Sequence, residues 1–232
     1  MREALAAPGV AVEVFATDEV GNRHPELPAA ATAAGVPWLR CSGAVVEHLS
    51  DTVTPQGVVA VCRMPQVALA DAIRPGARLV TILAHVRDPG NAGTVIRVSD
   101  AAGADGVVLS HGSVDAYNAK CVRASAGSLF HLPVAAGPDP AAVVVAARAA
   151  GLLVLAADGA ADTRLDDLDS GTLAVPTAWL FGNEAWGLPS QLRALADEVV
   201  AVPIYGRAES LNLSTAAAVC LYASARAQHV GG

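Results

Sequence analysis

Apolar runs of strand length alternate with helix-like stretches along this 232-residue chain, and that alternation constrains the fold more than any other feature. One run, Leu79–Ala84, is apolar except for a single threonine, and Val107–Leu109, Leu152–Ala156 and Ala178–Phe181 follow further along. Runs of this kind are typical of parallel strands that helices cover on both faces. The chain is therefore expected to be an α/β protein with a mostly parallel sheet.

Two domains are expected, residues 1–73 and residues 78–232, with a break at Arg74-Pro75-Gly76. Met1–Leu5 is predicted to be the end of a helix with no strand before it. In the first domain we expect strands at Val10–Ala16, Trp38–Cys41 and Val58–Cys62, and helices at Leu27–Ala34 and Ala44–Leu49. In the second we expect further strands at Leu132–Ala135 and Glu198–Val202, and helices at Gly93–Ala102, Tyr117–Ser125, Pro140–Ala150, Ser190–Ala196 and Leu211–Gln228. Asp158–Gly171 is expected to be an acidic exposed loop, with or without a short helix.

Composition excludes several classes of protein. Hydrophobic residues make up 53% of the chain and charged residues 16%, which predicts a packed globular protein. A net charge of −7 argues against a general nucleic-acid coat protein, because non-specific binding to phosphates needs basic surface. An RNA-binding protein with this charge must concentrate its cations at the binding site.

The four cysteines are widely spaced, so we expect buried thiols in a reducing compartment and no metal site. The most apolar stretch, Ala141–Ala157, contains Arg148 and Gly151 and is predicted to be a helix followed by a strand. No signal peptide is visible, so a cytoplasmic protein with no membrane partner is expected.

Three polar segments follow apolar runs, and together they predict one composite site. They are Asn91–Arg97, Phe181–Pro189 and the stretch from Val202 through Ser210–Ser214. Because the carboxyl ends of parallel strands share one edge of a sheet, the polar side chains of these segments are expected to meet there.

In content and order these segments resemble the three signature motifs of the SpoU-type (TrmH-like) RNA ribose 2′-O-methyltransferases, a family of the SPOUT class. The resemblance covers residues 78–228 and implies a trefoil knot, bound S-adenosylmethionine and a homodimer. Residues 1–73 resemble the later part of the family's substrate-binding domain, and the resemblance leads us to expect that the opening strand and most of the first helix of that domain are missing here. One departure is Ala185, where the family most often has glycine.

The resemblance also implies roles for individual residues. Arg97 matches the catalytic arginine, Asn91 the residue that positions the 2′-hydroxyl, and Glu184 a residue that orients Arg97 or a ribose hydroxyl. A guanidinium is a poor base because its pKa exceeds about 12, so we expect Arg97 to hold a phosphate and stabilise the hydroxyl oxygen. An ordinary surface pairing of Arg97 with Asp100 is the alternative.

The other expected site residues fall into three groups. Ser210 and Asn212 complete the catalytic set and are also candidate caps of the last helix. The residues expected to bind the cofactor are Leu180, Phe181, Gly182, Asn183, Val202, Ile204, Leu211 and Leu213. Those expected to bind RNA are Arg87, Lys120, Arg123 and Ser125, and no residue is expected to bind a metal.

The sequence therefore predicts methyl transfer from S-adenosylmethionine to a ribose 2′-hydroxyl of structured RNA. Ribosomal RNA is preferred to transfer RNA because the first domain resembles the ribosomal branch. A transfer-RNA methyltransferase, a non-catalytic protein of the same fold that binds RNA or the cofactor, and a small-molecule α/β enzyme such as a nucleotide hydrolase are the alternatives.

Overall fold

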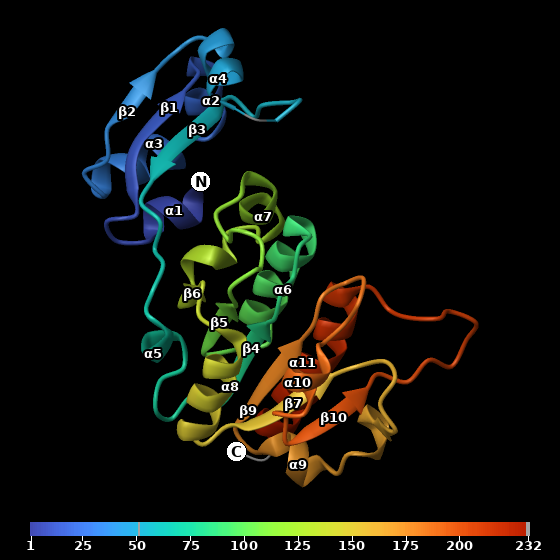
Figure 1. Cartoon of the computed structure of the whole chain (residues 1–232). Coiled ribbons are helices and arrows are strands. Elements are labelled where there is room, and N and C mark those ends of the chain that lie inside the picture. The colour runs from blue at the N-terminus through green and yellow to red at the C-terminus, as the bar shows by residue number, and fades with distance from the viewer. Residues whose placement is uncertain (51, 231–232) are drawn as a thin grey trace. The chain divides into compact units, whose positions relative to one another are not determined.

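A computed structural model describes residues 1–50 and 52–230 of the chain, which divides into two compact units between Pro65 and Gln66 (Figure 1). The first unit contains a three-stranded sheet of order β2-β1-β3. Strand β1 (Ala11–Ala16) is parallel to β2 (Trp38–Arg40) and antiparallel to β3 (Val58–Cys62). The helices of this unit are α1 (Arg2–Ala6), α2 (Asp18–Arg23), α3 (Glu26–Ala33) and α4 (Gly43–Leu49).

Helix α2 was not predicted from the sequence. It begins after Thr17, whose Oγ1 accepts a hydrogen bond from the Val20 N–H at 3.4 Å. Such a capping threonine followed by acidic residues favours a helix start. Val20 then packs with Val14 of β1 and Leu27 of α3 in the core of the first unit.

The second unit contains a seven-stranded sheet of order β6-β5-β4-β9-β7-β10-β8 in which every neighbouring pair is parallel. All five residues of β4 (Leu79–Leu83) are buried, and this strand lies between β5 and β9. The expectation of a mostly parallel α/β fold is confirmed. The remaining strands are β5 (Gly106–Leu109), β6 (Val134–Ala136), β7 (Leu153–Ala157), β8 (Thr163–Arg164), β9 (Thr177–Phe181) and β10 (Glu198–Ala201).

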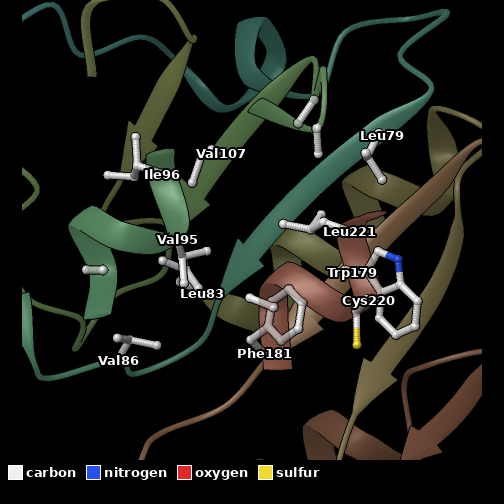
Figure 2. Close-up of a cluster of buried hydrophobic side chains, with 14 of the residues drawn as sticks. Leu79, Leu83, Val86, Val95, Ile96, Val107, Trp179, Phe181, Cys220 and Leu221 are labelled. Atoms are coloured by element: carbon white, nitrogen blue, oxygen red, sulfur yellow. The ribbon is translucent and has the colours of Figure 1, made fainter. Parts of the chain in front are cut away.

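Helices cover both faces of this sheet, and alternate strand residues point to opposite faces. Leu83 and Phe181 face α6 (Pro89–Ala101), α7 (Ala119–Ala124) and α11 (Leu213–Val230), in the cluster that Figure 2 shows. Ile82 and Leu180 face the other way, toward α5 (Leu69–Ala72), α8 (Pro140–Ala149) and α10 (Ser190–Arg193). Helix α9 (Ser170–Ala174) and the short 3-10 helices η1 (Ser128–Phe130) and η2 (Leu165–Asp167) complete the unit.

Several element boundaries differ from those expected, and the start of α6 differs most. Helix α6 begins at Pro89, four residues before Gly93, because Asp88 caps it by accepting the Asn91 N–H at 2.8 Å. Proline is well suited to the first position of a helix. The loop predicted at Asp158–Gly171 contains the short helix η2, which the sequence allowed, and the strand β8, which was not expected and which pairs in parallel with β10 at the sheet edge.

One expectation about the fold remains open. The trefoil knot stays a prediction. Within the described part of the chain, no helix combines the length and the apolar character needed to span a bilayer.

Candidate functional site

The three polar segments meet at one edge of the large sheet, where their side chains form a continuous hydrogen-bonded chain. Asn91 lies in the first turn of α6, Glu184 in the turn after β9, and Asn212 directly before α11. The Asn91 Nδ2 donates to Glu184 Oε1 at 3.3 Å, and the Asn212 Nδ2 donates to Asn91 Oδ1 at 2.9 Å. Glu184, Asn91 and Asn212 are called the polar triad below.

Glu184 also ties the loop after β4 to the turn after β9. Its carboxylate accepts the backbone N–H groups of Arg87 and Asp88, each at 3.2 Å. These residues directly precede α6, whose N-terminal end carries partial positive charge that favours a nearby carboxylate. Glu184 therefore organises the start of α6 and the Asn91 side chain. Of its two expected roles, the contact with Arg97 is not formed within one chain, and the orientation of a ribose hydroxyl stays a prediction.

The turn that carries Glu184 is closed by backbone contacts. Asn183 and Gly187 exchange two N–H···O bonds of 2.9 Å each, and Gly187 has a φ of 69°. A Cβ on Gly182 would lie 2.4 Å from the Gly187 carbonyl carbon, so the close approach requires glycine at that position. Among the described residues, His85 and Ala126 are the non-glycine positions with positive φ. Ala185 thus avoids the left-handed region, as its Cβ predicts.

Asn212 is the N-cap of α11. Its Oδ1 accepts the Ser214 N–H at 2.9 Å and the Ser214 hydroxyl at 2.6 Å, which leaves Nδ2 free to reach Asn91. The expected cap is therefore Asn212 and not Ser210, which is exposed two residues earlier and borders the pocket described next.

An apolar pocket of about 240 Å³ lies between the loops that follow β7, β9 and β10 and the start of α11. It is called the apolar pocket below. Seven of the eight residues expected to bind the cofactor line it: Phe181, Gly182, Asn183, Val202, Ile204, Leu211 and Leu213. The expectation for Leu180 is wrong, because its side chain is fully buried on the opposite face of the sheet, with Val154 and Leu192.

Two carboxylates at the apolar pocket were missed from the sequence. Asp158, which follows β7, forms a 3.1 Å ion pair with Arg193, and its side chain is 17% exposed. Glu209 is exposed, and among the described residues it makes no ion pair. The signal that could have found Asp158 is its position directly after β7, because ligands bind at the carboxyl ends of parallel strands.

A second, open and polar pocket adjoins the apolar one, and the two share Asn183 and Glu184. It is called the polar pocket below. Its other lining residues are Arg87, Asp88, Asn91, Ala185, Trp186 and Asn212. The polar triad therefore stands where an apolar cavity meets an open polar surface.

Arg97 is not brought to the polar triad within one chain. Six residues advance an α-helix by about 9 Å and leave it about 120° short of two full turns, so Arg97 and Asn91 occupy different faces of α6. Arg97 is exposed and borders neither pocket, and its side chain forms no hydrogen bond or ion pair within residues 1–50 and 52–230. Its alternative partner, Asp100, instead contacts His131 Nδ1 at 2.7 Å.

Gly93 serves helix packing. A Cβ there would lie 2.3 Å from the Cys121 carbonyl oxygen, so the chain that approaches it is the backbone of α7. Helix α7 is thereby held against α6, and it brings Lys120 to Asp88 at 2.9 Å. The Lys120 hydrogen bond, followed by the Asn91 N–H, holds the pKa of the Asp88 carboxyl below its usual value.

The residues expected to bind RNA divide into two groups. Arg87 borders the polar pocket, and Lys120 and Arg123 are exposed on or beside α7. Ser125 is fully buried and its hydroxyl donates to the Val122 carbonyl at 2.8 Å, so the expected phosphate contact of its side chain is wrong. No group of three or more His, Cys, Asp or Glu side chains suited to a metal occurs in the described residues.

Comparison with known proteins identifies two matching family models. The model described as "SpoU rRNA Methylase family" matches residues 78–222. The model described as "RNA 2'-O ribose methyltransferase substrate binding" matches residues 1–68.

Similar relatives and solved structures cover nearly the whole chain. The 23S rRNA (guanosine(2553)-2'-O)-methyltransferase RlmP of Bacillus subtilis is 37% identical over 225 residues, which is 96% of this chain and 84% of that protein. The structure of the SpoU methyltransferase AviRb from Streptomyces viridochromogenes with the cofactor AdoMet has a TM-score of 0.83 at 32% identity, covering 100% of this chain and 88% of that one. An AdoMet-bound rRNA methyltransferase from Sinorhizobium meliloti has a TM-score of 0.82 at 30% identity, covering 97% and 85%.

Proposed function

The chain belongs to the SpoU rRNA methylase family, and from that premise we propose that it transfers a methyl group from S-adenosylmethionine to a ribose 2′-hydroxyl of ribosomal RNA. One observation carries the assignment of the site. The polar triad lies at the junction of the apolar and polar pockets, where a methyl donor in one can meet a hydroxyl group in the other.

The apolar pocket fits the methyl donor. Aliphatic side chains such as Ile204 and Leu213 suit the faces of an adenine, and the lining glycines Gly182 and Gly187 contribute backbone without side chains. The donor carries a sulfonium and an ammonium group, and the carboxylates of Asp158 and Glu209 at the pocket favour that positive charge. When bound, S-adenosylmethionine supplies an electrophilic methyl group.

The polar triad fits a ribose hydroxyl. Glu184 accepts from the Asn91 amide nitrogen and Asn212 donates to its oxygen, so the orientation of the Asn91 amide is fixed. One lone pair on Asn91 Oδ1 remains to accept the proton of the 2′-hydroxyl, and the second hydrogen on Asn212 Nδ2 remains to donate to its oxygen. Fixed donors and acceptors of this kind orient a weak nucleophile without reorganising during the reaction.

Arg97 acts in the site of a second copy of the chain. Its guanidinium is exposed and unpaired among the described residues, whereas Arg87 is the cation that already borders the polar pocket. Helix α11 exposes Val219 and Tyr222, by 41% and 51%, which gives a homodimer apolar surface to bury. In the dimer we place Arg97 of one protomer at the polar pocket of its partner, where it holds the phosphate beside the reacting ribose.

The activity is tested with labelled S-adenosylmethionine and two substrates, ribosomal RNA and transfer RNA. We expect incorporation into ribosomal RNA, and a loss of about 10²-fold or more in Asn91→Ala and Arg97→Ala, because misplaced reacting groups lose that much. Val145→Ala is the matched control, since this side chain is 63% exposed on α8 and borders neither pocket. Equal rates in Arg97→Ala and Val145→Ala would remove Arg97 from the mechanism, and incorporation into transfer RNA alone would change the substrate.

Mixing two inactive variants tests the shared site. Arg97→Ala and Asn212→Ala protomers are unfolded together, refolded and assayed. If Arg97 acts across the dimer, half of the sites in each mixed dimer are intact, and activity recovers to about a quarter of wild type under random pairing. If Arg97 acts within its own chain, the mixture stays inactive.

An enzyme of this kind works where ribosomes are, and we propose the cytoplasm as its compartment.

A further inference from the structure

An exposed tryptophan stands at the polar pocket, beside the polar triad. Trp186 is 54% exposed and lies two residues after Glu184, in the turn after β9. The other two tryptophans differ from it, since Trp179 is fully buried and Trp38 packs against the core of the first unit. A large aromatic surface left in water at a polar pocket is available to stack against a flat ligand.

The turn holds Trp186 in a defined place. Asn183 and Gly187 bracket it with two backbone hydrogen bonds of 2.9 Å, and the Ala185 N–H donates to Asn183 Oδ1 at 2.9 Å. Since these bonds fix the backbone on both sides of Trp186, little backbone entropy remains to be lost when its ring binds a ligand.

The His85 ring packs beside the indole of Trp186. The two ring centroids are 5.7 Å apart with a 43° angle between the planes, which lies within the range of favourable aromatic pairs. His85 has a φ of 57°, a conformation that costs free energy in a residue with a Cβ. Its N–H donates to Ser110 Oγ at 3.1 Å and its carbonyl accepts Asn183 Nδ2 at 2.8 Å, so two neighbours hold the strained residue in place.

We propose that Trp186, backed by His85, is the platform on which the base of the nucleotide to be methylated stacks. This inference rests on the proposed function and deepens it, because it says where the base goes once the ribose hydroxyl reaches the polar triad. Proteins that act on unpaired nucleotides commonly hold the bases against aromatic rings. Every base has a π-face, so the platform positions the nucleotide without selecting its identity.

The first test separates stacking from chemistry in steady-state methyl transfer to ribosomal RNA. Trp186→Ala is expected to raise KM for RNA by roughly 5- to 150-fold, the range for losing one base–aromatic stack, with kcat and the Kd of S-adenosylmethionine changed far less. Trp186→Phe should recover most of the loss and Trp186→Leu should not, because leucine fills space without a ring. The Val145→Ala control should match wild type.

The second test uses an RNA fragment whose target nucleotide, once mapped, is replaced by an abasic ribose that keeps its 2′-hydroxyl. Wild type should bind this probe more weakly than the intact fragment, by about the factor that Trp186→Ala loses, whereas Trp186→Ala should bind both alike. An equal penalty for the abasic probe in both proteins overturns the platform.

The outcomes of these tests distinguish a failure of the Trp186 platform from a failure of the proposed function. If wild type methylates RNA and all Trp186 variants match it, the platform is refuted and the function stands. If Trp186→Ala sediments as a monomer while wild type is a dimer, the side chain belongs to the subunit interface and the platform is likewise overturned. If wild type transfers no methyl group to any RNA, both inferences fall.

Discussion

Replacing Glu184 with alanine should loosen the loop before α6 by an amount that the hydrogen bonds define. The change removes the acceptor for the N–H groups of Arg87 and Asp88, at 3.2 Å, and for the Asn91 amide, at 3.3 Å. A hydrogen bond to a charged group contributes about 1.5–3 kcal/mol. These bonds are long and Glu184 is exposed, so water replaces much of their contribution and we expect a total loss of about 1–2 kcal/mol.

Amide hydrogen exchange measures that loss at the residues concerned. A loss of about 1–2 kcal/mol corresponds to exchange roughly 5- to 30-fold faster at the Arg87 and Asp88 N–H groups. Glu184→Gln should show a smaller change because it keeps one acceptor oxygen. The Ala84 N–H, which donates to the Phe181 carbonyl at 2.8 Å, is the internal control and should not change. Unaltered protection of Arg87 and Asp88 in Glu184→Ala would refute the role assigned to this carboxylate.

Two other substitutions test the frame around the site. Gly182→Ala places a Cβ 2.4 Å from the Gly187 backbone, so we expect a loss of about 1–3 kcal/mol in unfolding free energy and weaker S-adenosylmethionine binding by calorimetry. Gly206→Ala is the control and should change neither quantity, because no atom lies within 4 Å of its added Cβ. A Gly182→Ala protein with unchanged stability and binding would contradict the close contact. The pKa of the Asp88 carboxyl is lowered in the folded chain. The ionised carboxylate therefore stabilises the folded state at pH values above its ordinary pKa of 3.8, and this stabilisation is lost as the pH falls through the lowered pKa. Lys120→Ala removes the largest cause, so the NMR titration midpoint of Asp88 should rise; an unchanged midpoint would exclude the ion pair in solution.

The fold was predictable where local pattern and burial agree. For Leu79–Leu83 the sequence pattern and the structure agree. An apolar run without alternation predicts a strand that is covered on both faces, and all five residues are buried. The order of the strands was not predictable, because parallel pairing depends on contacts between distant segments. The start of α6 was missed because the helix was predicted to begin at Gly93, without use of the cap that Asp88 and Pro89 provide.

The sequence predicted which segments meet at the site, but it did not predict most of the contacts between their side chains. The carboxyl ends of parallel strands lie at one edge of the sheet, and this rule predicts that Asn91, Glu184 and Asn212 come together there. Which atom bonds to which depends on side-chain geometry. Glu184 was expected to orient Arg97 or a ribose hydroxyl, and within the chain its carboxylate accepts backbone N–H groups before α6. Leu180 was misassigned because neighbours on a strand point to opposite faces, and the sequence did not say which face binds the ligand.

The chemical identity of the product tests the central claim most directly. Ribosomal RNA is methylated with labelled S-adenosylmethionine and then hydrolysed in alkali, which cleaves only where a 2′-hydroxyl is free. We predict that the label appears in alkali-resistant dinucleotides with wild type and not with Asn91→Ala. Label in alkali-sensitive mononucleotides would mean that a base receives the methyl group, and the polar triad would then not be a site for a ribose hydroxyl.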